Sequence, residues 1–63
     1  MHEVSLCENI REMLIAEAQK NHFSRVRVVH LEIGALSGVE VDAMRFGFDA
    51  VMHGSIAEGA ELQ

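Results

Sequence analysis

The first twenty residues place apolar side chains at the spacing of one helix face. Apolar residues recur every three or four positions, and charged residues fall mainly between them. Ser5 is followed three residues later by Glu8, which is the pattern of a capping box at a helix N-terminus. We therefore expect an amphipathic helix over residues 5–20 that ends near Asn21. Its apolar face would consist of Leu6, Cys7, Ile10, Met13, Leu14 and Ala18.

The segment 25–33 is rich in valine and isoleucine and contains no proline, which predicts a β-strand that ends at Gly34. The alternation of apolar and polar residues along it is imperfect. Either the strand is partly covered on both faces, or it carries a bulge near Val28. The two candidate faces are Val26 and Val28 on one side, and Val29, Leu31 and Ile33 on the other.

A second helix is predicted after a second capping box, formed by Ser37 and Glu40. His53 and Gly54 supply a cation and a glycine where this helix should stop. Gly47 lies inside the helix and costs it about 1 kcal/mol relative to alanine, so it indicates either close packing or simple tolerance. The apolar stripe is Val41, Met44, Phe48, Val51 and Met52, with Phe46 slightly off it.

Residues 60–62 could begin another strand, so the predicted order is helix, strand, helix, strand. We interpret the chain as an α+β protein with two helices packed on a small, incomplete β-sheet. One full strand and a fragment do not make a stable sheet, because isolated strands need neighbours. Either more chain follows Gln63, or strands pair between molecules and form a homodimer.

Composition narrows the class of protein. Sixty-three residues form one domain at most, and the net charge of −5 argues against nucleic acid as a partner. No apolar run reaches the length of a membrane span, so we expect a soluble, cytoplasmic protein without a membrane partner. Cys7 is the one cysteine, which excludes an internal disulfide and a CxxC zinc site. We expect it to be a buried small hydrophobic residue, and no constellation supports a thiol enzyme.

The chain opens with Met1-His2-Glu3, which places several nitrogen donors close together by covalent geometry alone. These donors are the α-amine of Met1, the amide and imidazole of His2, and the amide of Glu3. Deprotonated amides are strong in-plane donors that favour square-planar Ni(II) or Cu(II) over tetrahedral Zn(II). A frayed terminus is the simpler alternative. The other histidines have no ligand spacing: His30 is expected to be partly buried in the strand, and helix ends explain His22 and His53.

Read as a whole, the chain resembles the HypA/HybF family of hydrogenase maturation proteins. The resemblance rests on "MHE" with "SLC" at the start, "LEIGALSGVE" in the middle and "GSIAEGAEL" at the end. It implies a nickel metallochaperone, which is not an enzyme. Such a protein delivers Ni(II) for the large subunit of [NiFe]-hydrogenase together with the GTPase HypB, and some relatives also serve urease.

The resemblance also implies a nickel site. The donors would be the Met1 terminus, the imidazole and backbone nitrogen of His2, and the backbone nitrogen of Glu3. Glu40 corresponds to an acidic neighbour of the nickel site in some relatives, but it also fits the role of a helix cap, and both readings stay open.

The chain departs from the family pattern after the second predicted helix. Family members continue into a zinc domain with two CxxC pairs, and this sequence has neither pair. Zinc is therefore not expected here, and we interpret residues 1–63 as a single nickel-binding domain truncated before the zinc-binding domain. The alternative function is a protein–protein interaction or self-association module with an inert N-terminus.

Overall fold

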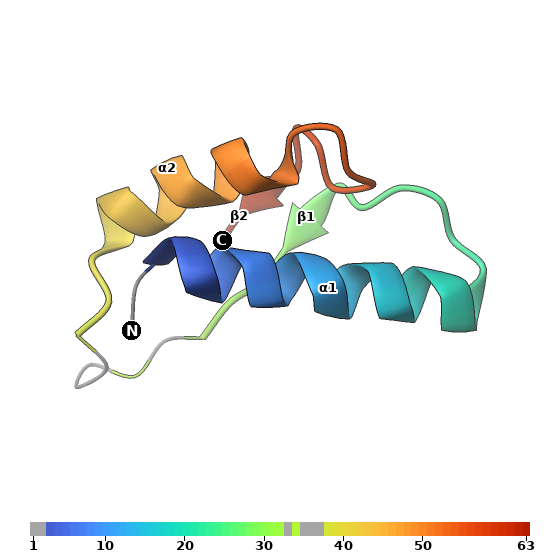
Figure 1. Ribbon diagram of the computed structural model, residues 1–63, viewed down its shortest axis with the longest axis horizontal. Helices are drawn as coiled ribbons and strands as arrows, with labels where there is room; N and C mark the ends of the chain where they lie inside the picture. The colour runs from blue at the N-terminus through green and yellow to red at the C-terminus, as the bar shows by residue number, and fades with distance from the viewer. Residues whose placement is uncertain (1–2, 33, 35–37) are drawn as a thin grey trace.

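The computed structural model describes residues 3–32, 34 and 38–63. Four elements follow one another along these residues in the predicted order of helix, strand, helix and strand (Figure 1). They are α1 (Glu3–Asn21), β1 (Val28–Val29), α2 (Val41–Met52) and β2 (Glu61–Leu62). The α+β class and the strand expected at 60–62 are confirmed.

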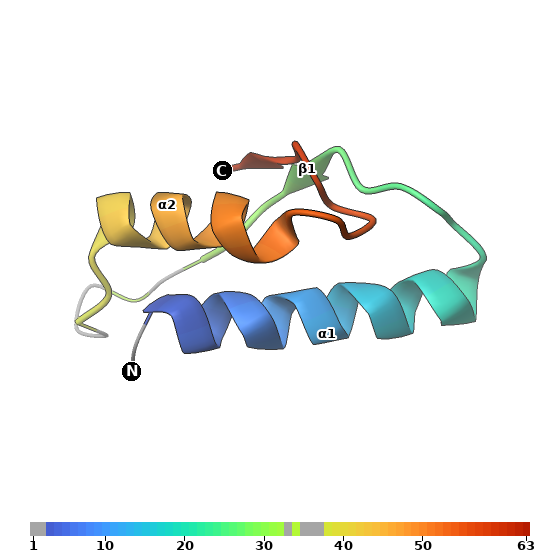
Figure 2. The ribbon, with the colours of Figure 1, turned by 45° about the horizontal axis from the view of Figure 1, so that its top comes forward.

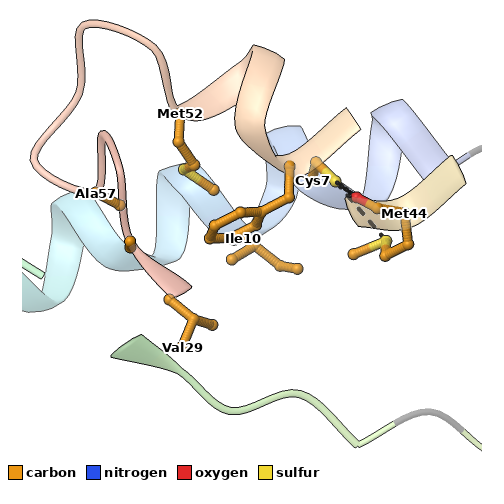
Figure 3. Packing of buried hydrophobic residues seen from close by; sticks show 8 residues of the cluster. Cys7, Ile10, Val29, Met44, Met52 and Ala57 are labelled. Carbon is orange, nitrogen blue, oxygen red and sulfur yellow. Dashed lines mark hydrogen bonds between the residues drawn. The ribbon is translucent and has the colours of Figure 1, made fainter. Parts of the chain in front are cut away.

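The two helices pack against each other, and the strands form a two-stranded parallel sheet on one side of them (Figure 2). In both views α1 and α2 run in the same direction and begin at the same end of the molecule. Residues of α1, β1, α2 and the turn before β2 form one apolar core (Figure 3), and Leu62 of β2 is partly buried against it. Its buried members are Cys7, Ile10, Val29, Met44, Phe48, Met52, Ala57 and Ala60.

Helix α1 begins earlier than the sequence pattern predicted. It starts at Glu3, so Ser5 lies inside the helix and the capping box with Glu8 is wrong. The end at Asn21 is confirmed, and His22 follows in the left-handed region with a φ of 59°. The expected apolar face is correct except at Met13, whose side chain is 66% exposed. Of the other residues on this face, two are buried and three are half-buried.

Strand β1 is much shorter than the predicted 25–33 and does not extend to Gly34. Backbone hydrogen bonds continue the pairing on either side, from Val26 N to Ile56 O at 2.9 Å and from Leu31 N to Gln63 O at 3.0 Å. Val26 and Val29 both pack against the core, whereas Val28 between them is 43% exposed. Val26 and Val29 are three positions apart, so the buried side of the segment switches from even-numbered to odd-numbered residues between them. This switch accounts for the imperfect alternation of apolar and polar residues.

Helix α2 has Glu40 as its N-cap, so the predicted capping box with Ser37 as the cap is wrong. Ser37 itself lies outside the described residues, as does Ile33. The helix ends at Met52, with His53 as the C-cap and Gly54 at a φ of 78°, as expected. The stripe is buried at Met44, Phe48 and Met52 and half-buried at Val51, but Val41 is 58% exposed.

Gly47 lies where α2 approaches α1. A Cβ at this position would lie 3.6 Å from both the Sγ of Cys7 and the Cγ2 of Val4. These are ordinary van der Waals distances, so the glycine sits at a helix–helix contact that has room for one methyl group. The sequence left open whether Gly47 indicates close packing or simple tolerance. Both apply, because the helices are in close contact there and the contact would accept alanine. No helix within the described ranges is long and apolar enough to cross a membrane.

Candidate metal site at the N-terminus

The predicted metal site lies at the start of α1. Met1 and His2, which carry the amine and imidazole donors, lie outside the described residues. Glu3 is the first residue of α1 and is half-buried. The first N–H groups of an α-helix have no carbonyl acceptor within the helix. The backbone nitrogen of Glu3 is one of the predicted nickel donors. Because it lies at the helix start, it makes no hydrogen bond within the helix.

Glu40 lies at the start of the second helix, and its carboxylate acts as a cap. Oε1 accepts a hydrogen bond from Asp42 N at 3.1 Å, and Oε2 accepts one from Ala43 N at 2.6 Å. These two N–H groups are among those that a helix start leaves without acceptors. The cap reading of Glu40 is thus confirmed, and its role as a nickel neighbour stays a prediction.

Acidic side chains gather at the end of the molecule where both helices begin. Glu3 lies in the first turn of α1, Asp42 in the first turn of α2, and Glu40 caps α2 (Figure 1). A helix N-terminus carries a partial positive charge, which favours carboxylates there. The same field favours a backbone amide that has lost its proton to a metal, because that amide is an anion.

Cys7 lies one turn after Glu3 and is fully buried, as predicted. Its Sγ is 3.7 Å from the carbonyl oxygen of Met44 and 3.7 Å from that residue's sulfur (Figure 3). Burial, and to a smaller extent the negative charge of Glu3, raises the pKa of the Cys7 thiol above its ordinary value. The thiol therefore stays protonated at neutral pH and packs as a small hydrophobic residue between the helices.

The remaining described histidines do not form a metal site. His53 Nδ1 lies 2.8 Å from Glu58 Oε2, and the same oxygen accepts a hydrogen bond from Gly54 N at 3.1 Å. His30 is exposed, so the expectation that it is partly buried in the strand is wrong. In the part of the chain that the structure describes, no three histidine, cysteine, aspartate or glutamate side chains are grouped to hold a metal ion.

An apolar cavity of about 230 Å³ opens beside the C-terminal ends of the strands. Arg45 is one of the residues that line it, and its Nη1 donates a hydrogen bond to the carbonyl oxygen of Leu62 at 2.9 Å. The lining contains no histidine, cysteine or carboxylate, so it is not a second metal site. No sequence signal indicated this cavity, because its walls come together only in the fold. The lining residues are Leu31, Val41, Met44, Arg45, Leu62 and Gln63.

Comparison with known proteins decides the family. A family model described as "Hydrogenase/urease nickel incorporation, metallochaperone, hypA" matches residues 1–63, the whole chain. The chain belongs to the HypA family. The expected resemblance is thereby confirmed, and HypA proteins are metallochaperones rather than enzymes.

Curated HypA relatives match over almost all of the chain. The hydrogenase maturation factor HypA of Alkalilimnicola ehrlichii is 57% identical over 63 residues, which are 100% of this chain and 56% of that protein. The HypA of Azorhizobium caulinodans is 58% identical over 62 residues, 98% of this chain and 55% of that protein. The HypA of Xanthobacter autotrophicus is 53% identical over 62 residues, which are 98% of this chain and 55% of that protein. The chain thus spans a little over half the length of these HypA proteins.

Proposed function

We propose that this chain binds Ni(II) at its N-terminus and hands it on during the maturation of [NiFe]-hydrogenase. The observation that carries the proposal is the match of a nickel-incorporation family to residues 1–63, beginning at Met1-His2-Glu3. The HypB-type GTPase and the hydrogenase large subunit are the partners that this function requires. Nickel is the cargo of the protein and not a group that it retains.

The donor chemistry supports a nickel chelate. The Met1 amine, the His2 amide and imidazole, and the Glu3 amide lie along three consecutive residues. Four nitrogens in one plane suit Ni(II) and Cu(II), whereas Zn(II) prefers a tetrahedron. The start of α1 at Glu3 leaves that amide free and places it in the positive field of the helix end. Both effects lower the cost of removing its proton.

A terminal site also suits delivery. Its donors must lose protons to bind, so nickel binding releases protons and strengthens as pH rises. A free amine titrates near pH ~7.7 and a histidine near ~6.5, so the chelate responds to pH around neutrality. A carrier benefits from such a site, because protonation or competing ligands on a target can release the ion without unfolding the helices.

A nickel titration on two proteins tests the proposal. One carries the native Met1 terminus, and the other carries two extra residues before it, which displaces the amine and leaves every other donor in place. We expect only the native protein to bind one Ni(II) and to develop the visible absorption band of a square-planar complex. Equal binding by both proteins would overturn the N-terminal site.

A matched pair of histidine variants sharpens the test. His2→Ala should abolish nickel binding, whereas His22→Ala, at the far end of α1, should leave it unchanged. Circular dichroism on both variants reports whether the helices persist. If the native protein and both variants fail to bind nickel while folded, the function of this chain is instead an interaction module with an inert N-terminus.

A further inference from the structure

Phe46 is the most exposed large apolar residue in the part of the chain that the structure describes, at 79%. It lies on α2 two positions from Met44 and two from Phe48, and both of these residues are buried. Two positions are about 200° around a helix, so Phe46 points away from the core. A single exposed ring is ordinary on a protein surface, so its neighbours decide whether it belongs to a binding face.

The side of α1 next to Phe46 carries a second exposed apolar residue, Val4. Its Cγ2 lies 3.6 Å from where a Cβ would stand on Gly47, the residue after Phe46, so the two apolar side chains flank the line along which the helices meet. Glu8 and Glu12 follow Val4 at intervals of four positions and therefore continue its side of α1. Both are exposed.

On α2, carboxylates flank Phe46 along the helix. Asp42 precedes it by four positions and Asp49 follows it by three, so all three share one side of α2, and both aspartates are exposed. Together these residues form what we call the acidic helix face. Its members are Val4, Glu8, Glu12, Asp42, Phe46 and Asp49.

The negative charge of the acidic helix face is not neutralised by the chain itself. Within the described ranges, none of its four carboxylates forms an ion pair. Arg45, the only cation in α2, instead donates a hydrogen bond to the carbonyl oxygen of Leu62. Arg11 of α1 is half-buried and has no carboxylate partner. The face therefore combines an exposed aromatic ring with charges that have no partner in the chain.

We propose that the acidic helix face docks a protein whose surface offers an apolar pocket bordered by lysine and arginine residues. Phe46 would fill the pocket as the anchor, because aromatic side chains carry much of the binding energy of protein interfaces. The surrounding carboxylates would pair with the basic border and steer the encounter. The same charge repels nucleic acid, an anionic membrane surface and a second copy of this face.

This inference rests on the proposed nickel function and adds to it the place at which the partner in nickel transfer binds. Val4 directly follows Met1-His2-Glu3. Both helices begin at that end of the molecule (Figures 1 and 2). A protein docked on the acidic helix face would therefore lie beside the proposed nickel donors, and the ion could pass over a short path.

Biolayer interferometry tests the face against two purified probes, the HypB-type GTPase and the hydrogenase large subunit of the same organism. The chain is attached through its C-terminus, so the Met1 amine stays free. We expect at least one probe to bind the native chain and to bind Phe46→Ala at least tenfold more weakly. Met13→Ala is the matched control and should bind normally. Met13 is also exposed, but it lies nine positions after Val4 and so on the opposite side of α1.

A charge variant tests the carboxylates separately. The double variant Glu8→Gln, Asp49→Asn keeps the shape of the face and removes two charges. It should bind the same probe more weakly than the native chain does, and its affinity should depend less on salt concentration. Circular dichroism on every variant shows whether the helices persist.

Three results would overturn the docking face: neither probe binds the native chain, a bound probe tolerates Phe46→Ala, or Met13→Ala weakens binding as much as Phe46→Ala does. A nickel titration on Phe46→Ala separates this failure from failure of the proposed function. We expect that variant to bind Ni(II) as the native chain does. If nickel binds but the face does not dock, only the docking inference is wrong. If the native chain binds no nickel, the proposed function fails whatever the face binds.

Discussion

Glu40 Oε2 accepts a hydrogen bond from the backbone nitrogen of Ala43 at 2.6 Å, and this contact caps the start of α2. A capping side chain satisfies amide groups that the helix cannot satisfy itself. Glu40 was also a candidate neighbour of the nickel ion. The cap needs only an oxygen that accepts a hydrogen bond, whereas a role beside the metal needs the negative charge. Substitutions of Glu40 can therefore separate the two roles.

We predict that Glu40→Ala destabilises the protein by about 1 kcal/mol, because Asp42 N and Ala43 N lose their acceptors. Glu40→Gln should recover part of this loss, since the amide oxygen can still accept a hydrogen bond. Urea denaturation measures both. If Glu40 is only a cap, both variants bind nickel with native affinity; a tenfold loss in Glu40→Gln would show that the negative charge serves the metal.

Gly47→Ala should stabilise the protein by up to about 1 kcal/mol. Alanine removes the entropic cost of glycine in a helix, and its methyl group would meet Cys7 and Val4 at 3.6 Å without a clash. Thermal unfolding followed by circular dichroism provides the measurement. A lower melting temperature would mean that the contact between α1 and α2 is tighter than these distances indicate.

Phe48→Ala should destabilise the protein by about 3–5 kcal/mol, because the ring is only 1% exposed at the centre of the core. A protein of this size has little stability to lose, so that variant is expected to unfold. Phe48→Leu keeps most of the volume and should cost less than about 1.5 kcal/mol. Phe46, two residues earlier, is 79% exposed, and Phe46→Ala should change stability by less than about 0.5 kcal/mol. Equal effects at the two phenylalanines would contradict the orientation of α2.

The Cys7 thiol should make stability fall at alkaline pH. Its pKa is raised by burial and by Glu3 in the folded protein, so the unfolded chain ionises first, near the ordinary value of 9.0. The stabilising contribution is complete below that pH and is lost as the pH rises from there through the higher folded pKa. Denaturation midpoints measured between pH 7 and 11 should show the loss, and Cys7→Ala should lack this component. Thiol-labelling reagents should react with native Cys7 far more slowly than with the unfolded chain.

The helices could be predicted from the sequence because their apolar spacing is local. The C-terminal ends of α1 and α2 lie close to their expected positions. The errors lie at the helix starts, where Ser5 and Ser37 matched a capping pattern that the chain does not use. At the second start a long carboxylate, that of Glu40, reaches the amides directly, and a rule that expects a short polar side chain at this position overlooks it.

The sheet could be predicted only in part. The valine-rich segment and Ala60-Glu61-Leu62 were both identified, but their parallel register joins distant parts of the chain and has no local signal. The contact from Arg45 to Leu62 depends on the same tertiary arrangement. The proposed nickel donors could be named from the sequence because they belong to three consecutive residues, so covalent geometry alone brings them together. The arrangement of Met1 and His2 lies outside the described residues and stays a prediction.

The parallel pairing of β1 with β2 has a consequence for synthesis on the ribosome. Chains are made from the N-terminus, so α1 and the valine-rich segment emerge well before Glu61 and Leu62. During that interval β1 has no strand on either side, and Val29, which β2 helps to bury, faces water. The nascent chain therefore passes through a stage in which its valine-rich segment has no paired strand, and such a segment is prone to aggregate. Rapid synthesis of the segment that contains Glu61 and Leu62, or the binding of a chaperone, would protect newly made protein from aggregation.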